Sequence, residues 1–147
     1  MSLVQARAWL WARLRTGNVV QCPCCARDMA VYKWQLYGTA VRLLALYYRA
    51  GATDHWVSRQ TVVRMGHKGG GDESRLEHWG LIEQKRGERG MWRVTQRGES
   101  FLFGELAVPQ AAFTCVKEVL FFDGPEITIE KFMPKWFNYD LLRVVPE

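Results

Sequence analysis

The segment HWGLIEQKRGERGMWRVTQRG, residues 78–98, contains two apolar clusters separated by a short charged run with two glycines. Ile82 and Gln84 share one side of the first cluster, and Trp92 and Val94 share one side of the second. Alternation of this kind is typical of strands, and a short link containing glycine is typical of a hairpin. The segment therefore predicts two antiparallel strands joined at a basic tip of sequence RGERG.

Helices are expected on both sides of this hairpin. The longest runs through QLYGTAVRLLALYYRAG, where apolar residues recur at helical spacing. The residues expected on its buried side are Leu36, Thr39 or Ala40, Leu43, Leu44 and Tyr47. After a brief extended piece, Ser58 is expected to cap a short helix that ends at Met65. A glycine-rich turn then leads to a helix that Asp72 caps and Gly80 ends, and Thr95 caps the helix after the hairpin.

The fold class predicted from this order is α+β. After Pro109 the chain reads as two strands turned by Asp123-Gly124-Pro125, with a short closing helix around Phe137–Leu142. The sequence then divides into three parts. These are residues 1–33, an N-terminal helix with a cysteine hairpin; residues 34–105, the helices and basic hairpin; and residues 106–147, the C-terminal β-hairpin and short helix.

The N-terminal residues MSLVQARAWLWARLRTG predict an amphipathic helix. Its expected apolar face consists of Leu3, Ala6, Trp9, Leu10 and Leu14. The expected water-facing arginines are Arg7, Arg13 and Arg15. Because arginines interrupt the apolar stretch and no small-residue cleavage site follows, we expect a helix here and no signal peptide.

The order of elements in residues 34–105 is that of a winged helix-turn-helix. The residues LEHWGLIEQKRGERGMWRVTQRGESF resemble winged-helix proteins of the MarR and PadR kind. In those proteins the recognition helix often ends in an L…GLI pattern, a charged wing follows, and W-x-V/L-T-x-x-G leads into a helix. The resemblance implies a small intracellular protein that binds double-stranded DNA as a transcriptional regulator. It also implies a homodimer held by the terminal elements, for which Trp11, off the apolar face of the first helix, is a candidate.

The resemblance assigns contacts to the hairpin and to the helix before it. Arginine and glycine at the tip give charge without bulk, which suits a phosphate backbone or a minor groove. The expected wing contacts are Lys85, Arg86, Arg89 and Arg93. Arg75, with Ser74 beside it, is the expected base-reading residue. The expected phosphate contacts on the preceding helix and turn are Arg59, Arg64, His67 and Lys68.

The acids of the recognition helix leave a second interpretation open. Asp72, Glu73 and Glu77 repel phosphates unless they accept from cytosine amino groups. Asp72 and Glu73 also have a structural role, because acids at a helix start complement its dipole. Charged hairpin tips are usually just solvated, and winged-helix folds also dock on proteins. The alternative function is a non-enzymatic interaction module, an adaptor or inhibitor of phage type that binds a host protein.

The sequence CPCC places Cys22 and Cys25 at the C-x-x-C spacing of a zinc knuckle. No second C-x-x-C or H-x-x-x-H follows, so the motif resembles half of a zinc ribbon. The remaining candidate ligands are Cys24, Cys115, His55, His67 and His78, and their spacing predicts no site. Three interpretations stay open. The cysteines bind zinc, in one version shared between two copies of the chain; they form a metal-free knuckle that has lost its partner half; or they pack as small apolar residues.

Charge and composition favour an anionic partner. The formal net charge is +5, and residues 1–105 carry 16 Lys and Arg against 9 Asp and Glu, whereas residues 106–147 carry 4 against 6. No apolar run reaches the roughly 18 residues of a membrane span. Since the cysteines do not form a disulfide framework, a reducing setting is expected, the cytoplasm of a bacterium or of a phage-infected cell. The sequence lacks a phosphate loop, a nucleophile elbow and H-E-x-x-H, so no catalysis is expected.

Overall fold

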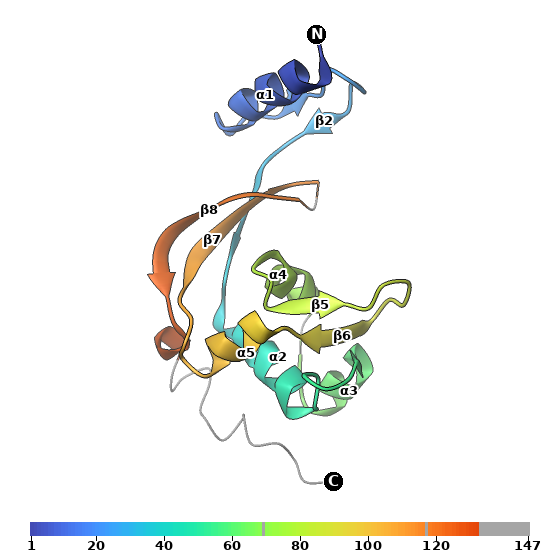
Figure 1. Cartoon of the computed structure of the whole chain (residues 1–147), viewed down its shortest axis with the longest axis vertical. Coiled ribbons are helices and arrows are strands. Elements are labelled where there is room, and N and C mark those ends of the chain that lie inside the picture. The colour runs from blue at the N-terminus through green and yellow to red at the C-terminus, as the bar shows by residue number, and fades with distance from the viewer. Residues whose placement is uncertain (69, 117, 133–147) are drawn as a thin grey trace.

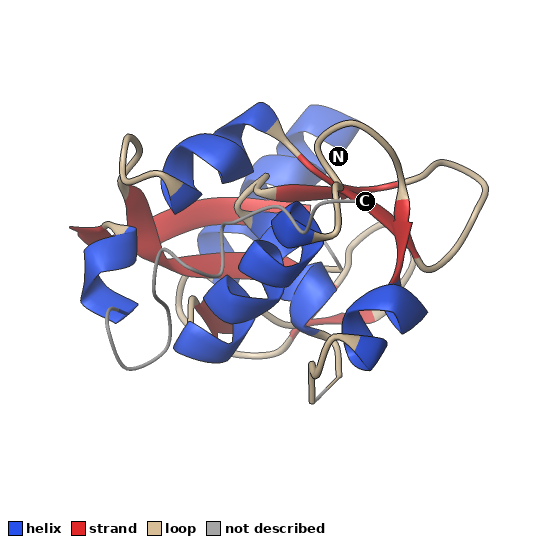
Figure 2. Ribbon diagram, turned by 90° about the horizontal axis from the view of Figure 1, so that it is seen from below, coloured by secondary structure: helices blue, strands red, loops and turns tan. Residues whose placement is uncertain are grey.

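The computed structural model describes residues 1–68, 70–116 and 118–132, and within them the chain has an α+β fold (Figure 1). The helices are α1 Leu3–Leu14, α2 Gly38–Arg49, α3 Arg59–Arg64, α4 Asp72–His78 and α5 Gln96–Leu102, with a 3-10 turn η1 Ile129–Phe132. The strands are β1 Val20–Gln21, β2 Asp28–Met29, β3 Tyr32–Gln35, β4 Val57–Ser58, β5 Ile82–Gln84, β6 Met91–Val94, β7 Val108–Cys115 and β8 Glu118–Ile127. They form three small antiparallel sheets, in the orders β1-β2, β3-β7-β8 and β4-β6-β5. Seen along the long axis, strands run across the molecule and reach its edges, with helices on either side of them in projection (Figure 2).

Helix α2 is the centre of the core. Leu43, Leu44 and Tyr47 are 0% exposed, and α2 contacts α4, α5 and β6. At the position where either Thr39 or Ala40 was expected to be buried, Ala40 is buried and Thr39 is exposed. The predicted amphipathic helix is therefore confirmed, with its apolar side enclosed by the helices and the hairpin that follow it in the chain.

The predicted caps of the short helices are largely confirmed. The Ser58 hydroxyl accepts a hydrogen bond from the Thr61 N–H at the start of α3, and the Thr95 hydroxyl accepts one from the Gly98 N–H at the start of α5. The prediction for α4 is wrong by one residue, because its N-cap is Gly71 and Asp72 is the first helical residue. Gly71 has a φ of 79°, a left-handed conformation that glycine adopts without the strain of a Cβ.

The predicted turn at Asp123-Gly124-Pro125 is wrong. These residues lie inside β8, and the chain reverses between Cys115 and Glu118. Opposite Gln110 the register shifts, so that two residues of β8 face one residue of β7, which is a β-bulge. The φ of 88° at Gly124 accommodates the bulge, and Pro125 is tolerated because β8 is an edge strand. The helix expected around Phe137–Leu142 lies outside the described residues.

Strand β3 was not expected as part of the C-terminal sheet. It pairs with β7 in the register Tyr32–Thr114 to Gln35–Ala111. The Trp34 indole N–H donates to the Thr114 hydroxyl at 2.8 Å, and Trp79 packs against Phe122 with ring centroids 6.2 Å apart. The long hairpin β7-β8 is thus attached both to the segment before α2 and to the end of α4.

Helix α1 lies at one end of the molecule, beside the end of the β7-β8 hairpin and away from α2–α5 (Figure 1). Only Ala6 and Leu14 of its expected apolar face are buried, whereas Leu3 is 77% and Trp9 36% exposed. The expected helix is therefore present, and its expected apolar face is buried only in part. Helix α1 meets the sheet only at this narrow end. There the Trp11 ring packs against the Phe121 ring of β8, with ring centroids 5.9 Å apart. No helix in the described residues is both long and apolar enough to cross a bilayer.

Candidate nucleic-acid interface

The hairpin β5-β6 has the predicted register and is fixed to the end of α4. Ile82 pairs with Val94 and Gln84 with Trp92, as the alternation indicates. The Leu81 N–H donates to the Leu76 carbonyl at 3.2 Å. Only residues 79–81 separate the helix from the strand, and Trp79, Leu81 and Ile82 are buried, so the orientation of the hairpin is set by the core.

Two of the four predicted wing residues are available to a ligand at the hairpin tip. Arg86 and Arg89 are exposed, and among the described residues neither forms an ion pair. Lys85 pairs with Glu88 at 2.7 Å along the tip. Arg93 pairs with Glu83 at 2.6 Å across the two strands, and its guanidinium lies 4.3 Å from the centre of the Trp56 ring. Arg93 therefore belongs to the base of the hairpin.

A groove of about 520 Å³ separates the hairpin tip from the exposed side of α4. Its lining residues are Glu77, Gln84, Lys85, Arg86, Gly87, Glu88 and Arg89. A Cβ built at Gly87 or Gly90 would meet no atom within 4 Å, so the tip is a narrow projection with open space around both glycines. Arg86 and Arg89 of this projection therefore line the groove, together with the acids Glu77 and Glu88.

The acids at the start of α4 are turned inward. Glu73 is 2% exposed, accepts a hydrogen bond from the Tyr47 hydroxyl at 3.1 Å and pairs with Arg59 at 3.4 Å. Burial, together with the negative charge of Glu73, raises the pKa of Tyr47 far above its ordinary value. Asp72 lies 3.7 Å from the His67 ring nitrogen and 4.0 Å from Arg75. The repulsion of phosphates expected from these two acids is thus reduced by internal partners, and Glu77 is the acid that stays exposed.

We expect Glu73→Ala to lower the free energy of unfolding by about 1–3 kcal/mol, since the buried Tyr47 hydroxyl loses its acceptor. Urea denaturation measures this change. Glu77→Ala removes the same charge from the exposed side of the same helix and should alter stability by less than about 0.5 kcal/mol. Equal effects of the two substitutions on the free energy of unfolding would show that the hydrogen bond from Tyr47 to the buried Glu73 carboxylate does not stabilise the fold.

Arg75, the predicted base-reading residue, is held against the rest of the protein. Its guanidinium donates to the Gln35 carbonyl at 2.7 Å and lies 5.1 Å from the centre of the Trp34 ring and 4.8 Å from that of Tyr37. These contacts join α4 to the end of β3 and to Tyr37, the residue before α2. Ser74 is exposed, so of the two residues predicted to read bases it is the one that faces solvent.

His78 packs beside Arg75 on the same aromatic ring, 5.1 Å from Trp34. Burial, and secondarily the charge of Arg75, lowers the pKa of His78 below its ordinary 6.5. The unfolded chain therefore binds more protons than the folded chain as the pH falls through 6.5.

We expect His78 to reduce stability as a solution is acidified from about pH 7.5 to about pH 5, and His78→Gln to flatten that part of the profile. Urea midpoints measured across this range give the comparison. Parallel profiles for the two proteins would contradict a role for this imidazole.

The basic residues predicted on α3 and the following turn differ in their exposure to solvent and in their partners. Arg59 points to Glu73, and its side chain is 39% exposed. Arg64 and Lys68 are exposed, whereas His67 is 8% exposed and buried beneath the turn. Arg64 and Lys68 are therefore the members of this group that face solvent freely.

Residues 22–27 close the β1-β2 hairpin as a knuckle. The Cys22 N–H donates to the Arg27 carbonyl at 2.8 Å, and the Ala26 N–H donates to the Cys22 carbonyl at 2.9 Å. The backbone N–H groups of Cys24 and Cys25 bond to the Cys22 sulfur and lower the pKa of that thiol. Within the described part of the chain no three His, Cys, Asp or Glu side chains converge on a metal position. The other predicted ligand candidates thus do not join Cys22 and Cys25.

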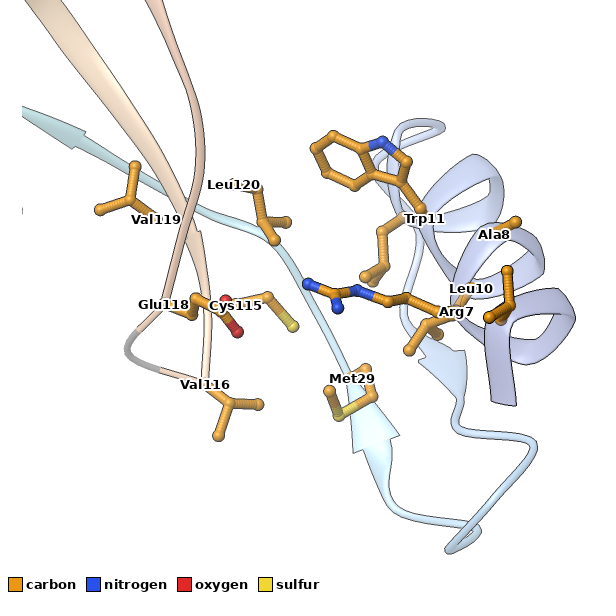
Figure 3. Close-up of a pocket in the computed structure, with 12 residues that line it drawn as sticks. Arg7, Ala8, Leu10, Trp11, Met29, Cys115, Val116, Glu118, Val119 and Leu120 are labelled. Atoms are coloured by element: carbon orange, nitrogen blue, oxygen red, sulfur yellow. The ribbon is translucent and has the colours of Figure 1, made fainter. Parts of the chain in front are cut away.

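A crevice that the sequence did not indicate lies between α1 and the end of the β7-β8 hairpin (Figure 3). It has a volume of about 590 Å³, and its walls are mostly aliphatic. The charged residues among its lining are Arg7 and Glu118, and Arg7 points across the crevice toward the hairpin (Figure 3). Cys115 forms part of the hairpin wall, where burial raises the pKa of its thiol.

Comparisons with known proteins give no family for this chain: no family model matches it, and no curated protein or solved structure does so either. Function is therefore inferred from the geometry of the hairpin, the helix before it and the knuckle.

Proposed function

We propose that the protein binds double-stranded DNA as a small winged-helix regulator and has no catalytic activity. The observation that carries the proposal is the pair of exposed arginines, Arg86 and Arg89, without ion-pair partners among the described residues. They project on a glycine-containing tip beside a groove. Arginine binds phosphate oxygens through a planar, permanently charged fork of donors, and the narrow tip lets both side chains approach a duplex.

The arrangement of the neighbouring elements supports a winged helix. Helices α2, α3 and α4 precede the hairpin in the chain, α5 follows it, and the small sheet has the order β4-β6-β5. In winged helices the first short strand pairs with the second strand of the wing, which is the pairing of β4 with β6 here. The net charge of +5 agrees with an anionic partner.

Recognition through this surface is expected to depend on phosphates more than on bases. Arg75 is occupied by Gln35 and two aromatic rings, and Glu77 occupies the exposed side of α4. The remaining solvent-facing basic residues near the hairpin and α3 are Arg64, Lys68, Arg86 and Arg89. Binding should therefore tolerate most sequences, with Ser74 as a polar contact to base edges.

Fluorescence anisotropy with a labelled random duplex tests this proposal. With two to four phosphate contacts, log K should fall with log salt at a slope of about −1.8 to −3.6, so affinity drops roughly 10- to 150-fold between 50 and 200 mM salt. Absence of binding at 50 mM salt would refute the proposal and direct the search to a protein partner. An affinity that does not change with salt concentration would also contradict the proposal, because it would show that the hairpin tip does not contact phosphates.

A further inference from the structure

The knuckle of residues 22–27 is a tight loop that its own backbone closes. The Cys22 N–H donates to the Arg27 carbonyl, and the Ala26 N–H donates to the Cys22 carbonyl. Ala26 holds a left-handed conformation with a φ of 62°, which is uncommon for a residue other than glycine. This loop brings Cys22 and Cys25 onto one turn at the C-x-x-C spacing of a zinc knuckle.

The same loop supplies only half of a metal site. Zinc in structural sites takes four ligands in tetrahedral geometry, and C-x-x-C pairs provide two of them. Within residues 1–68, 70–116 and 118–132 no His, Asp, Glu or further Cys completes a group of three. Cys24 is exposed on the same turn, and Cys115 is buried in the β7-β8 hairpin.

The surface around the knuckle is suited to a second copy of the chain. The knuckle lies at the α1 end of the molecule, away from α2–α5 (Figure 1). Helix α1 contacts β1, the strand that leads into the knuckle, and the chain exposes large apolar side chains at its start and just before β1. These are Met1 79%, Leu3 77%, Val4 78% and Val19 66% exposed. Arg27 and Asp28 are adjacent and exposed, so two copies related by a twofold axis can place each arginine against the partner's aspartate.

We propose that Cys22 and Cys25 of two copies bind one zinc ion between them, as a tetrathiolate site that links the chains through their N-terminal ends. The four thiols lose their protons to solvent as the ion binds. The exposed apolar residues of α1 and Val19 are covered by the partner in the linked form. This assembly is independent of DNA binding, although it would place two hairpin tips on one particle.

Zinc titration of the full chain under reducing conditions tests the proposal, with metal content and mass read by native mass spectrometry and light scattering. We expect half a zinc ion per chain and a particle of twice 17.0 kDa, which a chelator returns to monomers. One zinc per monomer, no bound zinc, or a dimer that survives chelation would each overturn the shared site.

Matched cysteine variants locate the ligands. Cys22→Ser and Cys25→Ser should each abolish the zinc-dependent dimer, whereas Cys24→Ser, on the same turn, and Cys115→Ser, in the hairpin, should retain it. Cobalt in place of zinc gives a second readout, because four thiolates in tetrahedral geometry produce visible absorption bands. Retention of dimer and bands in Cys22→Ser, or their loss in Cys24→Ser, would contradict the assignment.

Discussion

Gly98→Ala should lower the free energy of unfolding by about 3 kcal/mol or more, the largest stability effect expected of a single methyl group in this protein. A Cβ at Gly98 would overlap the Leu81 carbonyl oxygen and come within 3.0 Å of a Val94 methyl. The Leu81 carbonyl cannot yield, because it accepts the Thr95 N–H at 3.2 Å and belongs to the link between α4 and the hairpin. Helix α5 would have to move off the hairpin.

Urea denaturation followed by tryptophan fluorescence measures this effect. Gly70→Ala is the matched control, because its Cβ would lie 3.4 Å from the flexible end of Arg59 and its φ is not in the left-handed region. We expect the control to change stability by less than about 0.5 kcal/mol. A Gly98→Ala protein as stable as the wild type would show that α5 packs on the hairpin less closely than described.

The double substitution Arg86→Ala with Arg89→Ala should reduce affinity for a random duplex about tenfold or more at low salt. Each lost phosphate contact lowers the steepness of the salt dependence by about 1, so the slope should fall by about 2. The urea midpoint should stay unchanged, because both side chains are exposed and neither has an ion-pair partner in the described residues.

The control for this variant has the same net charge, because it also loses two arginines, but it loses them at a different place in the molecule. Arg13→Ala with Arg15→Ala removes two exposed arginines from the last turn of α1 and its C-cap, at the far end of the molecule (Figure 1). We expect this protein to bind DNA nearly as well as the wild type. Equal losses in both variants would indicate attraction to the net charge alone, and no loss in the hairpin variant would remove the tip from the interface.

Short-range signals in the sequence predicted the centre of the fold correctly. Ser58 and Thr95 cap helices as expected, and the alternation of Ile82, Trp92 and Val94 gives the register of the basic hairpin. Each of these features depends on residues within a turn or two of one another. Local propensity and hydrogen bonding are sufficient to specify them.

Features that depend on distant partners could not be predicted in this way. Arg75 is 40 residues from Gln35, whose carbonyl holds it, and Glu73 is 26 residues from Tyr47. In the same way, Asp123-Gly124-Pro125 has the composition of a turn, yet pairing with β7 makes it a bulge. Tertiary contacts decide which charged residues of α4 face inward and which side of α1 is covered. No local pattern in the sequence encodes these contacts.

Amide chemical shifts of the ¹⁵N-labelled protein, recorded during titration with a random duplex, test the binding surface most directly. A chain of 17.0 kDa is suited to this measurement, and its glycines provide reporters at both ends of the molecule. We expect the largest changes at Gly87 and Gly90 on the hairpin tip, with smaller ones along α4, and none at Gly17 beyond α1. Changes centred on α1 and the knuckle, or none at saturating duplex and low salt, would contradict a DNA-binding hairpin.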